Sequence, residues 1–136
     1  MGDQVRRVDY FYVEVPDKPG EGARVLGALK EAGINLLNFT AFPGSGGKAQ
    51  LDLVTDNADA LVKAAKGAGL TLSARKQAFF IQGQNRPGAA GEILKKLSDA
   101  KVNVRAANGS AGQGGFGMIL WVSPSDYASA AKALGV

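Results

Sequence analysis

The chain repeats itself after half its length, and this internal repeat constrains the fold more than any other feature of the sequence. A shift of 68 residues aligns the two halves of the 136-residue chain without a gap. Such a register is typical of a small structural unit that is encoded twice. Many pairs are identical, among them Phe11 and Phe79, Pro19 and Pro87, Gly20 and Gly88, Leu26 and Leu94, Leu29 and Leu97, Asn35 and Asn103, Gly47 and Gly115. The repeat predicts two units, residues 1–76 and residues 77–136.

Within each unit, the hydrophobic pattern predicts a strand, a helix, two strands and a second helix. Aromatic and β-branched runs indicate the first strands, at 8–15 and 78–82. Apolar residues at helical spacing follow, at 22–29 and 90–97. The later strands are expected at 34–42, 50–55, 102–107 and 116–123, the weaker helices at 58–68 and 125–134, and a closing strand of the first unit at 70–75. This order predicts an α+β fold of two ferredoxin-like βαββαβ units, each an antiparallel sheet with helices on one face.

The second unit has no closing strand of its own in this pattern. In the register of the repeat, residues 2–7 stand before the strand at 8–15 as residues 70–75 stand before the strand at 78–82. We therefore expect residues 2–7 to supply the last strand of the second unit. A frayed terminus is the alternative.

The turn between the first strand and the first helix is the main candidate for a binding site. Its glycines open a helix whose free amides carry partial positive charge, and the missing side chains let a carboxylate approach the backbone. Asp17 stands just before the turn, where it suits a ligand ammonium, and asparagines at the second strand complete a polar ring. These groups together suit an α-amino acid. The candidate ligand-binding residues of the first unit are Asp17, Gly20, Glu21, Gly22, Asn35 and Asn38.

The second unit repeats this arrangement with weaker chemistry. A neutral amide, Asn85, replaces Asp17, so the second site is expected to hold an ammonium less strongly. The candidate ligand-binding residues of this unit are Asn85, Gly88, Ala89, Asn103 and Asn108. A structural interpretation also stays open for both turns, because a Pro-Gly turn capped by Asp or Asn commonly does no more than begin a helix.

The sequence of the first turn and helix resembles the signature of the ACT domain, an amino-acid-binding regulatory module. The stretch is Val15-Pro16-Asp17-Lys18-Pro19-Gly20-Glu21-Gly22-Ala23-Arg24-Val25-Leu26-Gly27-Ala28-Leu29, followed by Ala32-Gly33-Ile34-Asn35. Asn85-Arg86-Pro87-Gly88 with Val102-Asn103-Val104 is similar to it, although Ala89-Ala90-Gly91 departs from the larger apolar residue common there. The resemblance implies a tandem sensor that binds an amino acid at an interface between paired domains, through Asp17 and Gly20 and through Asn85 and Gly88. It also implies either action on a separate enzyme or regulator or a role as a ligand carrier.

The composition excludes most catalytic mechanisms. The chain has no His and no Cys, which removes the usual zinc sites, thiol nucleophiles and imidazole bases. Its glycine-rich stretches form neither a Walker sequence nor a dinucleotide fingerprint. We therefore expect no enzyme activity, no metal and no cofactor. The sequence shows no long apolar run, so we expect no membrane association and a cytoplasmic protein.

An RNA-binding module on the same fold is the alternative function. Gly115-Phe116-Gly117-Met118-Ile119-Leu120-Trp121 partly matches the RNA-recognition motif, and Phe79-Phe80-Ile81 stands where its companion would lie. Gly114 occupies the basic position and Met118 replaces a stacking aromatic, which weakens this interpretation. A net charge of +4 is also too small to require a polyanion, so nucleic acid is not the expected partner.

Apolar side chains on both faces of the first strands predict self-association. Tyr10, Tyr12 and Phe80 alternate with Phe11, Val13 and Phe79 along these strands. Helices cover one face of each sheet, so the other face needs a different cover. We expect a homodimer.

Overall fold

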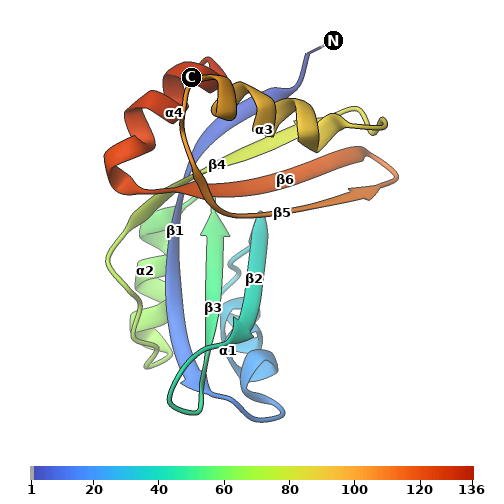
Figure 1. Cartoon of the computed structure of the whole chain (residues 1–136). Helices are drawn as coiled ribbons and strands as arrows, with labels where there is room; N and C mark the ends of the chain where they lie inside the picture. The colour runs from blue at the N-terminus through green and yellow to red at the C-terminus, as the bar shows by residue number, and fades with distance from the viewer. Residues whose placement is uncertain (1) are drawn as a thin grey trace. The chain divides into compact units, whose positions relative to one another are not determined.

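The computed structural model describes residues 2–136, and those residues form two copies of one α+β arrangement (Figure 1). The elements of the first copy are β1 (Gln4–Pro16), α1 (Glu21–Glu31), β2 (Asn38–Pro43), β3 (Lys48–Thr55) and α2 (Ala58–Gly67). The elements of the second are β4 (Lys76–Gly83), α3 (Ala89–Asp99), β5 (Val104–Gly112), β6 (Gly115–Val122), a short 3-10 turn (Pro124–Asp126) and α4 (Tyr127–Leu134). The predicted ferredoxin-like fold is confirmed, and the strand order is β2-β3-β1-β4-β6-β5.

The first unit, which comprises residues 9–76, buries one face of its strands under two helices. β1 pairs antiparallel with β3, and Phe11 stands opposite Leu53. Alternate residues of these strands form the core with Val25 and Leu29 of α1 and with Leu61 of α2. Since side chains alternate between the faces of a strand, this set places both helices on the same face (Figure 1).

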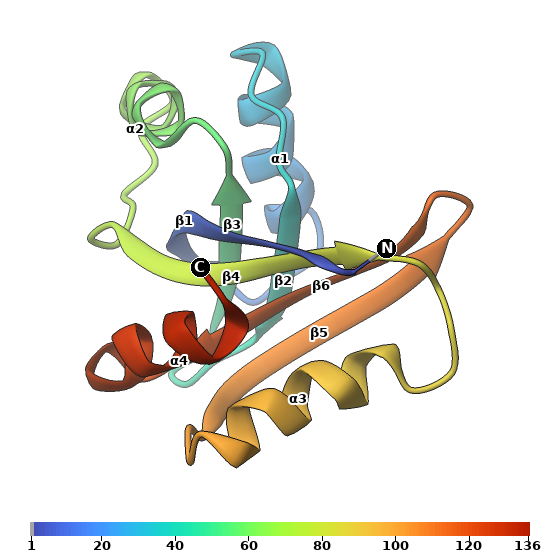
Figure 2. The same cartoon turned by 90° about the horizontal axis from the view of Figure 1, so that it is seen from above.

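The second unit has the same construction around β4, β6 and β5. Phe79 stands opposite Leu120 in the antiparallel pair of β4 and β6. Both side chains are fully buried in a core that includes Ile93 and Leu97 of α3 and Leu134 of α4. α3 and α4 accordingly lie on one side of this sheet (Figures 1 and 2).

The division of the chain differs from the expected boundary at residue 76, because the described residues up to Val8 belong to the second unit. β1 is one continuous strand of 13 residues, and its beginning lies in that unit while the remainder lies in the first. Val5 packs against the second core, and Arg7 Nη2 donates to the carbonyl oxygen of Val136 at 3.0 Å. Residues 1–76 are therefore not one contiguous unit.

The closing strand expected at 70–75 is not formed, and a single bridge between Val13 and Leu72 stands in its place. Ser73 explains the interruption. Its amide donates to Tyr12 O at 2.8 Å, but the Tyr12 amide donates to Ser73 Oγ at 2.9 Å rather than to a backbone carbonyl. A serine side chain thus takes the position of the next ladder bond, which ends regular pairing.

Candidate functional site

The Pro-Gly turn of the first unit begins α1 as expected but already contains a carboxylate. Gly20 is the N-cap residue, with a φ of 93° that favours glycine. Glu21 lies in the first helical turn, and its Oε1 is 3.0 Å from Arg24 Nη2. Asp17 is exposed, and its amide donates to Gly47 O at 2.9 Å beside the β2–β3 hairpin. The acidic Glu21 thus lies in the first turn of α1, but no side chain of the described residues caps the helix.

The equivalent turn of the second unit corrects one candidate residue. Gly88 is the N-cap of α3, with a φ of 81°, and Asn85 is exposed. Ala89 is buried at the edge of the core, and its amide donates to Arg86 O at 3.3 Å. The Ala89 side chain is therefore not available to a ligand, and the prediction that the backbone of this turn binds one stays a prediction.

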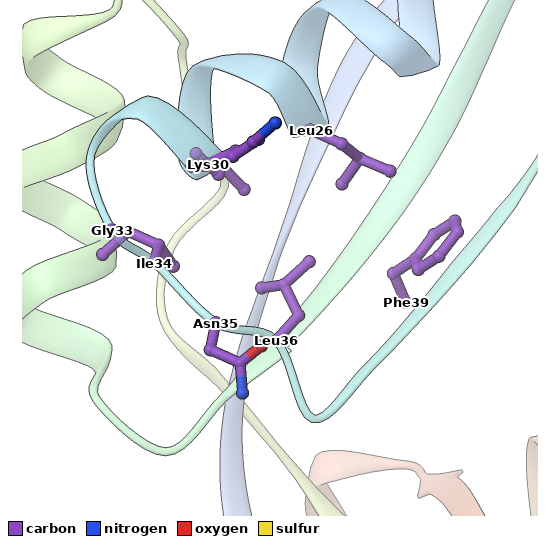
Figure 3. A pocket seen from close by; sticks show the side chains of 8 residues that line it. Leu26, Lys30, Gly33, Ile34, Asn35, Leu36 and Phe39 are labelled. Atoms are coloured by element: carbon purple, nitrogen blue, oxygen red, sulfur yellow. The ribbon is translucent and has the colours of Figure 1, made fainter.

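A hollow of about 420 Å³ lies at the other end of α1, where the chain leaves the helix and enters β2 (Figure 3). α1 contributes Leu26 and Lys30, and β2 contributes the exposed ring of Phe39. The connecting segment places Asn35 at the rim, with its side chain directed away from the helix. Gly33, in the left-handed region at φ 74°, turns the chain out of α1. The hollow is mostly apolar, with one ammonium group and one amide.

The second unit has a hollow at the repeat-equivalent place, between the end of α3 and the beginning of β5. It measures about 390 Å³ and is lined by Leu94, Ser98, Lys101, Val102, Asn103 and Val104. These residues stand 68 positions after Leu26, Lys30, Gly33, Ile34, Asn35 and Leu36, all of which line the first hollow. Each hollow therefore has one lysine, but the lysines come from different positions of the repeat, Lys30 in the first unit and Lys101 in the second.

One unit does not bring the predicted site residues together. Asp17 and Gly20 precede α1, whereas Asn35 follows it. A helix of 11 residues is about 16 Å long at 1.5 Å per residue, which is farther than one amino acid can reach. The same separation holds for Gly88 and Asn103 on either side of α3. A single unit therefore does not form the expected ring of contacts around one ligand.

The two remaining asparagines lie on the sheet face opposite the helices. Asn38 stands across from Val54, and its Oδ1 accepts a hydrogen bond from Thr40 Oγ1 at 3.4 Å. Asn108 stands across from Ile119, which alternates with the core residues Met118 and Leu120. Neither asparagine lines either of the two hollows described above.

The same face of the first unit carries a buried carboxylate. Asp52 lies opposite Tyr12 on β1 and Thr40 on β2, and it is only 8% exposed. Gln50 Nε2 donates to its Oδ1 at 2.9 Å. Burial raises the pKa of Asp52, and the hydrogen bond from Gln50 and the charge of Lys76 offset this only in part. Within residues 2–136, no three acidic side chains gather in a way that could hold a metal ion.

The sequence predicted Asn35 and Asn103, which line the hollows, but it did not single out the other lining residues. Nothing in the sequence pattern distinguishes Lys30 and Leu26 from other residues of an amphipathic helix, or Phe39 from other residues of a strand. The available signal was the repeat itself, because the shift of 68 residues aligns both linings position by position.

Comparison with known proteins finds solved structures of the same fold. No protein-family model and no curated protein matches the chain. Protein BT0572 from Bacteroides thetaiotaomicron is similar over 97% of this chain and 91% of its own, with a TM-score of 0.79 and 20% identity. The regulatory subunit of aspartate kinase from Thermus thermophilus matches over 99% and 95%, with a TM-score of 0.69 and 16% identity. A putative C-terminal regulatory domain of aspartate kinase from Porphyromonas gingivalis matches over 98% and 94%, with a TM-score of 0.58 and 16% identity.

At these identities the likeness shows the fold alone. Of the helices in the described part of the chain, none has the length and apolarity that a membrane span requires.

Proposed function

We propose that this chain is a regulatory protein that binds an amino acid in the hollow at the end of α1, and in its repeat at the end of α3. The observation that carries the proposal is that hollows at equivalent places in both units each contain an asparagine at the same repeat position, apolar residues and one lysine. Both hollows fall in the range of small-ligand sites, roughly 300–1,000 Å³. The fold shared with regulatory subunits of aspartate kinase supports a regulatory role.

The chemistry of the first hollow suits both charges of an amino acid. The Lys30 ammonium attracts the ligand carboxylate. The C-terminal end of α1 carries partial negative charge and attracts the ligand ammonium, with the amide oxygen of Asn35 available at the rim. Leu26 and Phe39 offer an apolar surface for the ligand side chain.

A homodimer belongs to the same proposal. β2 ends the strand order, and it carries the exposed rings of Phe39 and Phe42, at 50% and 42%. An apolar edge strand of this kind favours pairing with another chain. Two copies would also allow Asp17 and Gly20 of one copy to approach the Asn35 hollow of the other, which a single unit does not permit.

The proposed role of the protein is regulatory and not catalytic. The chain would act on a separate enzyme or regulator, since its chemistry offers charged and apolar recognition groups rather than a nucleophile with its base.

Ligand binding is tested by a thermal-shift screen of the twenty amino acids against the intact protein. We expect at least one to raise the melting temperature, since a ligand at 100 times its dissociation constant adds roughly 2.7 kcal/mol of stability. Lys30→Met should weaken binding by about tenfold or more, consistent with loss of a charge-assisted hydrogen bond of roughly 1.5–3 kcal/mol.

Two further variants make this test specific. Lys66→Met removes an exposed lysine of α2 and should leave binding unchanged. Lys101→Gly removes the lysine of the second hollow and restores the residue of the first. If titration of that variant loses one of two binding events, both hollows bind. The absence of any shift, or full affinity in Lys30→Met, would contradict the proposal.

The RNA-binding alternative finds no support in the surface of the second unit. Phe79, Phe80 and Trp121, on the two strands that would carry the motif, are all buried. Stacking on bases needs exposed rings. A melting shift with single-stranded RNA but with no amino acid would reverse this conclusion.

A further inference from the structure

The guanidinium group of Arg86, in the turn before α3, is held by a carboxylate from the beginning of β1. Arg86 Nη1 donates to Asp3 Oδ1 and Nη2 donates to Asp3 Oδ2, both at 3.0 Å. Nη1 also donates to Gln84 O at 3.0 Å, and Nη2 donates to Glu92 Oε2 at 2.6 Å. Two parallel bonds between one guanidinium and one carboxylate form the geometry in which arginine recognises carboxylates.

Burial distinguishes Asp3 from the other carboxylate on Arg86. The Asp3 side chain is 9% exposed, whereas that of Glu92 is 60% exposed. The hydrogen bonds from Arg86 lower the pKa of Asp3, although burial opposes them. Asp3 is therefore an ionised carboxylate that is largely shielded from solvent, and Glu92 forms an ordinary surface pair.

Gly83 provides the space for this carboxylate. A Cβ at Gly83 would collide with Asp3 Oδ1 and would lie 2.9 Å from Asp3 Cγ and 2.8 Å from Phe116 Cε1. The repeat-equivalent residue of the first unit is Val15, whose own buried side chain fills its place. In the second unit, the Asp3 carboxylate occupies the volume that the missing side chain leaves.

We infer that Arg86, the Gly83 floor and the Phe116 ring form a carboxylate-binding pocket whose occupant is the chain's own Asp3, and that a small free carboxylate enters it when Asp3 is removed. The Arg86 guanidinium supplies two donors and lies 5.9 Å from the centroid of the Phe116 ring. Acetate has the atoms of an aspartate side chain, a methyl carbon and a carboxylate, so it is the matched probe. The pocket lies apart from both hollows and does not depend on the function proposed for them.

Chemical rescue of Asp3→Gly tests the inference. The melting temperature of this variant is measured in sodium acetate and in sodium chloride of equal ionic strength. We expect acetate to raise it by about 3 °C or more relative to chloride, at concentrations several times the dissociation constant. If Asp3→Gly folds only in acetate, the folded fraction is measured by circular dichroism as a function of acetate concentration. This fraction should rise with acetate and not with chloride.

Three controls separate this pocket from a general salt effect. The wild type has the pocket filled by Asp3, Asp3→Asn fills it with an amide, and Asp3→Gly/Gly83→Val fills it with the valine of the first unit. None of them should respond to acetate. In Asp3→Gly, the NMR signal of the Arg86 Nε–H should also move with acetate. Equal acetate shifts in all proteins, or no shift in Asp3→Gly by either measurement, would overturn the inference.

Discussion

Lys101 illustrates how one residue can oppose the local preference of the backbone. Among the described non-glycine residues, it alone has a positive φ, at 60°. Its repeat partner Gly33 takes the same turn, at 74°, where a residue without Cβ has no steric cost. A side chain in this region costs roughly 1 kcal/mol or more. In the proposed function, Lys101 supplies the ammonium group of the second hollow, and ligand binding explains why a lysine stands at this position despite the cost.

Asp52 is a residue whose charge opposes folding. Its pKa is raised in the folded protein, so the folded state binds its proton more tightly than the unfolded chain does. The free energy of unfolding therefore falls as the pH rises from the unfolded-chain pKa of 3.8 to the raised folded-state pKa. Above the folded-state pKa, the full cost of the buried charge is present.

Asp52→Asn should therefore stabilise the protein at pH 7, by roughly 0.5–1 kcal/mol, because it removes the buried charge and keeps an acceptor for Gln50. The gain should vanish below the ordinary aspartate pKa of 3.8, where Asp52 itself is neutral in both states. Urea unfolding at pH 7 and pH 3 measures the difference. The exposed Asp56→Asn is the control, and a loss of stability at pH 7 in Asp52→Asn alone would contradict the prediction.

At the scale of elements, β1 serves two units. Its first residues add to the second unit, and residues from Asp9 onward pair with β3 in the first. Within its residues 9–76, the first unit has no regular closing strand beside β1. The Leu72 bridge and the Ser73 hydrogen bonds stand at that edge instead. Exchange of an N-terminal strand between the units explains both arrangements.

Deletion of residues 2–7 should lower the melting temperature by several degrees, because it removes the Val5 packing and the Asp3 and Arg7 contacts. Calorimetry of the intact and shortened chains measures the change. Val5→Ser should account for part of the loss, whereas the exposed Gln4→Ser should not. An unchanged melting temperature after deletion would mean that the strand contributes nothing.

At the scale of the whole molecule, the proposal requires two copies of the chain. Sedimentation velocity at micromolar concentration should give a dimer, and Phe42→Lys should shift it to a monomer, because a charge in an apolar edge interface lacks a partner. Val62→Lys, which charges an equally exposed apolar residue on α2, should remain dimeric. A monomeric wild type, or identical behaviour of the two variants, would exclude β2 as the interface.

The sequence by itself determined the repeat, the element order and the fold class. These follow from local chemistry: apolar periodicity, the Pro-Gly turns before α1 and α3, and a register of 68 residues. It also located Gly20 and Gly88 where the helices begin.

Only the tertiary structure decided where the candidate sites lie. Asp17 and Asn35 belong to one predicted site, yet a helix about 16 Å long separates them. Asp3 and Arg86 stand 83 positions apart and share one partly buried ion pair, because the beginning of β1 belongs to the second unit. Pockets and ion pairs of this kind depend on contacts between residues distant in the chain, and no local pattern in a single sequence encodes those distances.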